Sequence, residues 1–453
     1  MERVQGNSAK RIWGWYFFDW ASQPYNTLLL TFIFAPYIKE VIGDGAKAQS
    51  LWGLTVGIGG ILIAMFSPIL GAIADTSGQR MRFIWLFSGM YVIGSAGLWL
   101  AAPEAMNLGL VLPLFVIGLV GMEFATTFTN AMLPDLAPRE KIGRMSGNGW
   151  AFGYVGGLLA LAIMLVLLAD NATTGKTFVG LDPILGLDAS QREGTRAVGP
   201  LTAIWYIVFM IPFFLFVRDP KGAKVSAGAV RHALSDLART VKQLPQHKGL
   251  FAYLTSSMIY RDGLNGMYAF GGVYAAGVLG WGVQDTGVFG LIAIISGALF
   301  AWLGGMADEW RGPRPVIIAS ILALLVAAIM CVLVTPTYVL GFAVPEGSKL
   351  PDMTFYLIGA IIGAAGGTLQ ASSRTMLVHQ ANPERMTEAF GLYALAGKAT
   401  SFIAPFSIGL VTHLSGSQQI GVTPLIVLFV VGLFLLRFVP KNGDNTAWAE
   451  NTH

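Results

Sequence analysis

The sequence has few charged residues for its length. Asp, Glu, Lys and Arg make up 12% of its 453 residues, whereas 54% are hydrophobic and the mean hydropathy is +0.62. A soluble domain carries about 25% charged residues, so this composition excludes an ordinary soluble protein. Because the apolar residues come in long blocks, the sequence predicts an all-α membrane protein whose helices cross the bilayer many times.

The sequence also lacks the residues of several common sites. Its single cysteine, Cys331, excludes an intrachain disulfide and a cysteine metal site. The five histidines form no HExxH motif, and no P-loop is present, so we expect no metal, no cofactor and no ATP hydrolysis. No nucleophile and base can be placed together, which argues against an enzyme. The net charge of +4 gives no reason to invoke nucleic acid.

Twelve apolar segments are long enough to cross a membrane, since a spanning helix needs roughly 20 residues. They are 12–39, 51–73, 83–101, 108–133, 146–169, 200–217, 249–278, 286–306, 315–335, 353–377, 388–411 and 422–439. The amino terminus, the even-numbered loops and the tail, counted with Arg437 at the end of span 12, hold 20 of the 29 Lys and Arg. The positive-inside rule therefore predicts that both termini lie in the cytoplasm. With no small-residue cleavage site in view, the first span is expected to be retained.

The spans divide into two sets of six. We predict an amino-terminal half at 1–217, a cytoplasmic linker at 218–248 and a carboxy-terminal half at 249–453. In the linker an apolar stripe recurs at helical spacing, formed by Val230, Leu234, Leu237, Val241 and Leu244. Such a helix is expected to lie along the cytoplasmic membrane surface or under the bundle. The long outward loop at 170–199 is either a lid or an ordinary surface loop.

One pattern appears twice in the chain, 244 residues apart. The first copy is residues 130–141 followed by Gly147 and Gly153, and the second is residues 374–385 followed by Gly391 and Gly397. A membrane protein built from two like halves usually has its working site between them. The repeat therefore indicates where the functional residues are expected.

A second pair of related segments lies at cytoplasmic loops. Gly71, Asp75, Gly78 and Arg80 match Gly304, Asp308, Gly312 and Arg314. The aspartate can accept hydrogen bonds from a facing helix amino terminus or an arginine, and the second glycine permits a sharp turn. These loops resemble the signature loop of the major facilitator superfamily, and we interpret Asp75, Arg80, Asp308 and Arg314 as gating residues.

Further motifs narrow the resemblance. They are 19–25 (Asp-Trp-Ala-Ser-Gln-Pro-Tyr), 133–138, 143–147, 369–374, 390–393 and 397–398. Together they are similar to the vacuolar-effluxer-like branch of the superfamily, which contains autophagy-related vacuolar amino-acid effluxers of fungi and many bacterial relatives. The resemblance covers the whole chain and implies a twelve-helix transporter in a bacterial inner membrane, acting as a monomer among membrane lipids. Here Gln23 and Pro24 replace the usual small residues, and the proline is expected to kink span 1.

Ionisable residues deep in spans are functional candidates, because they are costly in the bilayer. In the superfamily, spans 1, 4, 7 and 10 line the central cavity, and here these spans carry Asp19, Glu123, the pair Arg261 and Asp262, and Arg374. Glu123 is the first candidate for proton coupling, with a packing role as the alternative. Asp19 is the second, although it is also placed to pair with Arg374 and latch the inner gate. Arg261 and Asp262 are assigned with Arg374 to gating pairs.

Lys398 lies in span 11, where the repeat aligns it with Tyr154 of span 5. A cation present in one half only suits a non-symmetric solute, so Lys398 is predicted to bind a substrate carboxylate; it could equally snorkel or pair with Glu123. Aromatic and amide residues complete the predicted substrate set: Tyr154, Trp20, Gln23, Tyr25, Asn26, Tyr260, Asn265, Gln370 and Tyr393.

These residues and the resemblance together predict a secondary active transporter. Its expected substrate is a small polar or zwitterionic solute such as an amino acid, moved by alternating access with protons as the coupling ion. The family name implies efflux, and proton-coupled uptake of another polar metabolite is the alternative within transport. A lipid or lysolipid flippase would need a lateral apolar portal, and a sensor on the same scaffold would bind solute without flux.

Overall fold

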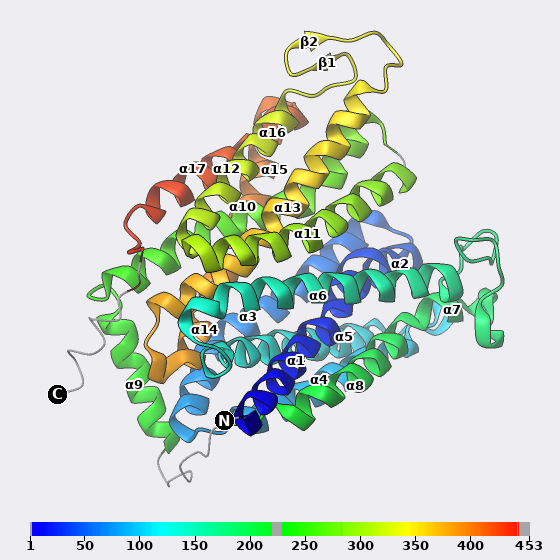
Figure 1. The fold of residues 1–453 in the computed structure, drawn as a ribbon. Coiled ribbons are helices and arrows are strands. Elements are labelled where there is room, and N and C mark those ends of the chain that lie inside the picture. The colour runs from blue at the N-terminus through cyan, green and yellow to red at the C-terminus, as the bar shows by residue number, and fades with distance from the viewer. Residues whose placement is uncertain (1, 220–228, 282, 442, 444–453) are drawn as a thin grey trace. The chain divides into compact units, whose positions relative to one another are not determined.

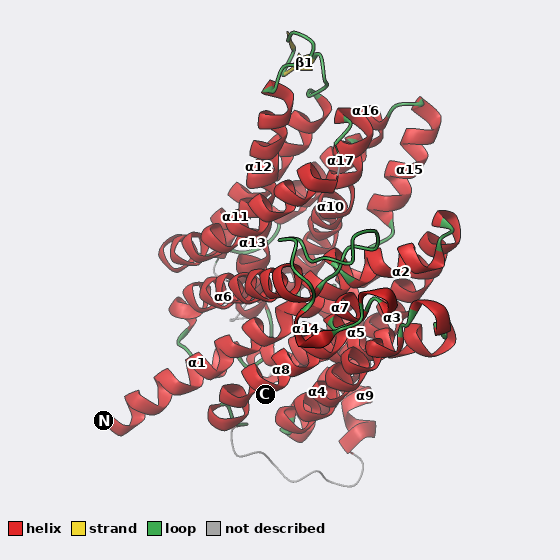
Figure 2. Ribbon diagram, turned by 90° about the vertical axis from the view of Figure 1, so that its right-hand side faces the viewer, coloured by secondary structure: helices red, strands yellow, loops and turns green. Residues whose placement is uncertain are grey.

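The computed structural model describes residues 2–219, 229–281, 283–441 and 443, and nearly all of its regular structure is helical (Figures 1 and 2). Residue contacts divide the chain into two compact units. Unit 1 is Met1–Met132 with Phe152–Ala233, and unit 2 is Leu133–Ala151 with Leu234–His453. The segment Leu133–Ala151 covers the loop between predicted spans 4 and 5 and the start of span 5, yet it packs with unit 2.

Unit 1 is built mainly from α1, α3, α4, α5 and α8. Its elements are α1 (Glu2–Pro24), η1 (Tyr25–Phe32), α2 (Phe34–Ile42), α3 (Gly45–Ser77), α4 (Arg80–Gly97), η2 (Leu98–Leu100), η3 (Pro103–Ala105), α5 (Leu108–Asn130), the later part of α6 (Ile142–Ile163), η6 (Met164–Leu168), η7 (Ile184–Gly186), η8 (Ala189–Gln191), α7 (Glu193–Arg196), α8 (Val198–Phe216) and the start of α9 (Ala229–Gln243). Buried aromatic rings join its helices, and Tyr91 of α4 stacks on Tyr206 of α8 with ring centroids 3.9 Å apart.

Unit 2 is built around α10, α11, α12, α13 and α17. Its elements are η4 (Leu133–Asp135), η5 (Arg139–Lys141), the start of α6, the rest of α9, α10 (Lys248–Leu279), α11 (Val283–Arg311), α12 (Pro313–Val332), β1 (Tyr338–Val339), β2 (Phe342–Ala343), α13 (Leu350–Gln380), η9 (Pro383–Arg385), α14 (Met386–Ala399), α15 (Ile403–Ser415), α16 (Gln418–Gly421) and α17 (Thr423–Leu436). The two short strands pair antiparallel as a hairpin between α12 and α13 (Figure 1).

The surface of α11 shows why these helices suit a bilayer. Large apolar side chains stay exposed at spacings of three and four residues, at Val288, Leu291, Ile295, Leu299 and Trp302. This spacing places them on one face of the helix. An exposed apolar stripe of this length is what a lipid-facing helix requires.

The twelve predicted spans correspond to helices of the structure. Among the described residues, ten helical stretches are long and apolar enough to cross a membrane. Predicted spans 1 and 7 are not among the ten, but α1, η1 and α2 cover the first and α10 covers the other. Two spans differ from continuous α-helices. Span 1 becomes a π-helix directly after Pro24, and span 11 is broken between α14 and α15.

The predicted repeat is confirmed in the order and position of the elements. The 3-10 turn η5 (Arg139–Lys141) and the turn η9 (Pro383–Arg385) are separated by the same 244 residues as the sequence motifs. The following helices, α6 and α14, begin at Ile142 and Met386, which keep this spacing. The local sequence therefore determines the same turn and helix start in both halves.

The linker helix α9 has a buried and an exposed face, but its buried face contains fewer residues than the predicted apolar stripe. Leu237 is buried, whereas Leu234 and Val241 are 42% and 50% exposed. The Val230 side chain and linker residues 220–228 lie outside the described residues. The exposed leucine and valine suit contact with a membrane surface, whereas Asp236 of the same helix forms an ion pair with Arg385 of η9 at 2.8 Å. Both predicted positions therefore stay open.

Candidate transport site and gates

Both gate loops turn through a glycine, as the sequence predicts. Gly78 follows α3 with φ of 63°, and Gly312 follows α11 with φ of 80°. Glycine adopts this backbone region without the strain that a Cβ atom brings. Beside the first turn, Arg80 Nη2 lies 3.2 Å from Asp75 Oδ1. In the second loop, Arg314 donates to the carbonyl of Arg437 at the end of α17.

Asp308 lies at the amino end of α6. Its side chain is buried, and a Cβ added to Gly143 would stand 2.6 Å from the Asp308 Cγ. One turn later, a Cβ on Gly147 would stand 2.6 Å from the Gly305 Cα. The first N–H groups of a helix lack intrahelical partners and carry partial positive charge, so this end of α6 suits a carboxylate.

Arg374 fastens the same stretch of α6 to α13. It is 3% exposed. Its Nε donates to Ser146 Oγ and its Nη2 to the Ser146 carbonyl, both at 2.8 Å. Ser146 Oγ in turn donates to the Ala371 carbonyl at 2.7 Å. We call the packing of segment Leu133–Ala151 on α11 and α13 the inner latch. Because Asp19 belongs to unit 1 and Arg374 to unit 2, their pairing stays a prediction.

In unit 1, three predicted site residues lie along a close contact between α1 and α6. Gly153 approaches the Asp19 backbone, Gly156 approaches Trp20, and Gly157 approaches Gln23. The Trp20 ring lies 5.9 Å from the stacked Trp205 ring and 4.5 Å from that of Phe152, and its carbonyl accepts a hydrogen bond from the Trp205 indole. Tyr154 lies on this turn of α6 and is half-buried.

Tyr25 and Asn26 open the π-helix η1. Tyr25 is fully buried, and its hydroxyl donates to the Phe115 carbonyl at 2.6 Å. In this structure Tyr25 is therefore a packing residue, and a substrate contact would need α5 to move. Asn26 is half-buried, and its carbonyl accepts from Thr31 in the next turn. Single π-helical turns recur at functional sites, which keeps this turn a candidate.

Glu123 lies in the middle of α5, as predicted, and is half-buried rather than enclosed. The Thr127 hydroxyl bonds its backbone carbonyl at 3.0 Å. These facts fit both the coupling role and the packing role, so the assignment of proton coupling to Glu123 remains a prediction.

In unit 2, Arg261 of α10 contacts α14. The Arg261 Cζ lies 3.9 Å from the centroid of the Tyr393 ring, and its Nη1 donates to the Tyr393 carbonyl at 3.0 Å. A Cβ on Gly397, one turn further, would stand 2.7 Å from the same Nη1. A guanidinium on an aromatic face is held by both dispersion and the ring quadrupole. The gating assignment for Arg261 is untested, and its observed contacts lie within one half.

Span 11 is broken a few residues after Gly397. Lys398 lies in the last turn of α14 and is half-buried. Residues 400–402 leave the helix, and α15 begins at Ile403. Asp262 of α10, 1% exposed, accepts a hydrogen bond from the Ala404 N–H at 2.9 Å. The sequence analysis treated residues 388–411 as one continuous helix, which is wrong at this point.

A signal for the break was present in the sequence. Pro405 is the third residue of α15, and proline lacks the N–H that a continuous helix would use. Proline is well tolerated only in the first turn of a helix. The repeat supports this explanation, because the position 244 residues earlier is Leu161 and α6 runs on through it without a break.

The remaining predicted substrate residues lie in different surroundings. Tyr260 is fully buried, and its hydroxyl lies 2.8 Å from Ser373 Oγ of α13, so it packs between helices. Asn265 is exposed one turn further along α10, and Gln370 is half-buried on α13. Asn265 and Gln370 are therefore better placed than Tyr260 to meet a solute.

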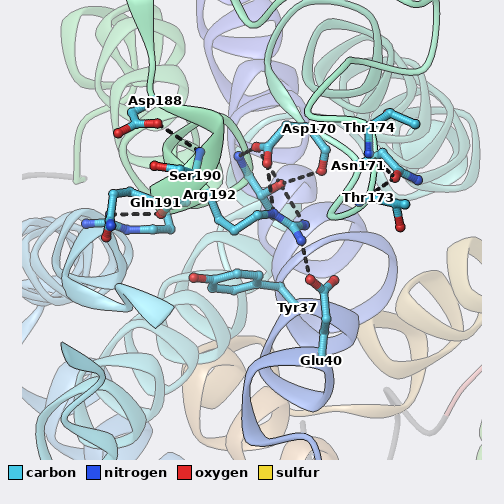
Figure 3. Close-up of polar contacts among 12 residues, drawn as sticks. Tyr37, Glu40, Asp170, Asn171, Thr173, Thr174, Asp188, Ser190, Gln191 and Arg192 are labelled. Carbon is cyan, nitrogen blue, oxygen red and sulfur yellow. Dashed lines mark hydrogen bonds and ion pairs between the residues drawn. The ribbon is translucent and has the colours of Figure 1, made fainter. Parts of the chain in front are cut away.

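The loop at 170–199 holds a charged cluster that the sequence analysis missed (Figure 3). Arg192 has φ of 53°, and its Nε lies 2.8 Å from the fully buried carboxylate of Asp170. Arg192 also forms an ion pair with Glu40 of α2 and lies over the Tyr37 ring, 5.6 Å from its centroid. The loop is thus fastened to the end of span 1. These charges at the ends of spans 1 and 5 and in the loop were the available signal.

The structure is similar to two solved structures of transporters. The proton:xylose symporter XylE is 14% identical with a TM-score of 0.67, covering 97% of this chain and 96% of that one. The transporter FucP, in the outward conformation, is 15% identical with a TM-score of 0.67, covering 95% and 98%. The chain therefore has the major facilitator fold of a multi-pass membrane protein. The family model described as vacuole effluxer Atg22-like matches residues 37–447, so the chain belongs to that family and is an MFS-type transporter.

Two relatives show how far this similarity extends. The uncharacterized MFS-type transporter YxiO of Bacillus subtilis (strain 168) is 25% identical over 434 residues, which are 94% of each chain. Autophagy-related protein 22 of Cryptococcus neoformans var. neoformans serotype D is 24% identical over 322 residues. The match covers 68% of this chain and 53% of the fungal protein, about half of its length.

Proposed function

We propose that this protein is a proton-coupled secondary transporter that exports a small polar or zwitterionic, amino-acid-like solute across a bacterial inner membrane by alternating access. The observation that carries the substrate class is the break between α14 and α15. It places the ammonium-bearing Lys398 within two residues of a helix end that lies in the middle of a span. In transporters, discontinuous helices supply such ends for binding charged solutes and ions near the bilayer midplane.

The chemistry of this region favours a carboxylate. Lys398 and Arg261 bring two cationic side chains to the last two turns of α14, and Tyr393 adds an aromatic face beside them. A carboxylate would gain charge-assisted hydrogen bonds here. For the amino group or the coupled proton, the acidic candidates are Asp19 and Glu123, which the superfamily resemblance assigns to cavity-lining spans.

The gating part of the proposal rests on the inner latch. Arg374 bonds Ser146 near the start of α6, the Asp308 side chain packs against Gly143, and the glycines at 143 and 147 allow the close approach. All these contacts join the one segment Leu133–Ala151 to α11 and α13, so a movement of that segment would make or break them together. We propose that the latch closes the cytoplasmic side and opens when solute is exchanged there. Asp75 and Arg80 are proposed to do the same at the first loop.

The test starts from the purified full chain in nanodiscs. A thermal-shift screen against amino acids, peptides, betaines and sugars should give stabilisation by a zwitterion, because binding to the folded state raises its stability. The stabilising solute is then labelled and followed in proteoliposomes by counterflow.

Lys398→Ala should reduce both the stabilisation and the counterflow measured at the solute concentration that half-saturates the wild type. The matched control is Lys349→Ala, which removes an exposed lysine just before α13. Movement of labelled lysolipid without solute flux would contradict the proposal and favour a flippase.

A further inference from the structure

Asp262 forms a helix cap across two spans inside the membrane region. The residue before α15, Phe402, offers no side-chain hydrogen bond to the new helix. Asp262 of α10 provides that bond instead, since its Oδ2 accepts from the Ala404 N–H at 2.9 Å. A capping oxygen normally comes from the residue at the helix start. Here it comes from span 7, so the outer segment of span 11 depends on one carboxylate of another helix.

A second contact fixes the end of α14 on the same face of α10. The Thr400 hydroxyl lies 3.4 Å from the Met258 carbonyl and 3.4 Å from the Ala396 carbonyl. Met258 and Asp262 are four residues apart on α10, as are Thr400 and Ala404 on span 11. Residues four apart share a helix face. Two successive turns of α10 therefore hold the two ends of the break. The Met258 carbonyl accepts from the Thr400 hydroxyl, and the Asp262 carboxylate accepts from the Ala404 N–H.

The other oxygen of this carboxylate is buried without a hydrogen bond. Asp262 is 1% exposed, and its Oδ1 has no hydrogen-bond partner among the described residues. Its neighbour Arg261 is turned onto the Tyr393 ring. A buried carboxylate that keeps its charge without a cation beside it is costly. Binding of a proton at Oδ1 would remove that cost.

Few other charged groups face this carboxylate. The titratable residues of α14 are Tyr393 and Lys398, both half-buried, and Glu388, which lies in the first turn of the helix and forms an ion pair with Arg385. On α15 the first titratable residue is His413, more than two turns beyond Ala404, and α17 carries none. On α13, Arg374 is bonded to Ser146.

We propose that Asp262 is a proton-binding site of the transport cycle, and that protonation at Oδ1 weakens its hold on α15 so that the two parts of span 11 move separately. A charged acceptor bonds an N–H group about twice as strongly as a neutral one, so uptake of one proton changes the cap directly. This inference rests on the proposed function as a proton-coupled transporter, and it adds a second coupling carboxylate, in the other half from Glu123.

The first test reads the proton without any solute. Infrared difference spectra of the full-length protein in nanodiscs, between about pH 5 and pH 9, should show the band of a protonated carboxyl group that grows as the pH falls. Asp262→Asn should lose this band, whereas Asp182→Asn, at an exposed carboxylate of the outer loop, should keep it. A band that persists in Asp262→Asn, or that follows sodium concentration at fixed pH, overturns the proposal.

The second test reads the cap. Hydrogen exchange of residues 400–406, compared with Asp262→Asn at each pH, should be slower in the wild type at high pH and should approach the variant as the pH falls. If Asp262→Asn does not fold, Asp262→Glu retains a carboxyl group and should shift the infrared titration. An unshifted titration in that variant, or equal exchange at every pH, contradicts the assignment.

Transport assays distinguish a failure of this inference from a failure of the proposed function. In proteoliposomes with the solute found by thermal shift, Asp262→Asn should keep counterflow and lose accumulation driven by a pH gradient. Wild-type accumulation in the variant overturns the inference alone. A protein that shows the Asp262 band but moves no solute contradicts the proposed function and leaves the proton site standing.

Discussion

The inner latch predicts that a single hydroxyl biases the transport cycle. Ser146 Oγ accepts from the buried Arg374 guanidinium at 2.8 Å and donates to the Ala371 carbonyl at 2.7 Å. Ser146→Ala removes both bonds but leaves the Ser146 carbonyl, which still accepts from Arg374. A neutral hydrogen bond contributes about 0.5–1.5 kcal/mol and one to a charged group about 1.5–3 kcal/mol. Since Arg374 keeps its second bond, we expect a loss of about 2 kcal/mol.

Such a loss is large for a two-state gate. About 2 kcal/mol corresponds to a shift of roughly 30-fold in the equilibrium between closed and open latch. The shift can be measured as a distance distribution between spin labels at Glu140, exposed on η5, and Trp310, 76% exposed at the end of α11. Both are placed as cysteines in a Cys331→Ala background, which removes the only native thiol. Ser146→Ala should populate a longer distance that is rare in the parent.

The control removes a buried hydroxyl that does not belong to the latch. Ser320 of α12 is 5% exposed and bonds the Val316 carbonyl of its own helix. Ser320→Ala should leave the distance distribution unchanged. Equal distributions in the two variants would refute the argument that the Ser146 contacts hold the latch closed.

Three further predictions concern coupling, substrate and packing. Glu123→Gln, which mimics the protonated acid, should abolish accumulation driven by a pH gradient while leaving counterflow largely intact; gradient-driven accumulation in this variant would exclude Glu123 as a coupling group. Lys398→Ala should weaken solute binding by about 1.5–3 kcal/mol in calorimetry, and Lys398→Arg should restore it only in part, because guanidinium is larger and planar. Gly147→Ala should open the latch at a cost of about 1–3 kcal/mol from overpacking against Gly305, seen as the same longer spin-label distance, whereas Gly60→Ala, where a Cβ meets open space, should not.

Much of the fold could be predicted because the signals are local and strong. Blocks of about 20 apolar residues define spans whatever their neighbours, and glycines at 78 and 312 mark turns whose positive φ the structure shows. The repeat also predicted that η5 and η9 would match, since the same residues at the same spacing make the same turn.

The partners of the predicted site residues were much harder to predict. Lys398 was recognised as a cation in one half only, but the break beside it depends on Pro405 and on the cap from Asp262, which is about 140 residues earlier in the chain. Arg374 was expected to pair with an acid, a pairing that stays a prediction, and the structure gives it hydrogen bonds to a serine side chain and carbonyl. The polar atom that bonds a buried charged side chain is determined by how the helices pack. The spacing of residues within one span does not reveal that partner.

The two halves show how a symmetric scaffold acquires a non-symmetric site. The repeat pairs Gly153 with Gly397, and each glycine lets its helix approach a charged residue of the first span in its half: Asp19 for α6 and Arg261 for α14. The close approach at the glycine is thus retained, to the Asp19 backbone in one half and to the Arg261 guanidinium in the other, while the charge of the neighbouring residue is reversed.

Proline at 405 then breaks the second helix where the first, with Leu161, continues. We propose that this difference is complementary to a solute with both charges, whose carboxylate would bind the two bases beside the helix break and whose amine would bind the acid of the other half. If this complementarity selects the substrate, solutes that lack either charge should be poor substrates even when they match in size, because a buried charge in the site would then be left without its partner.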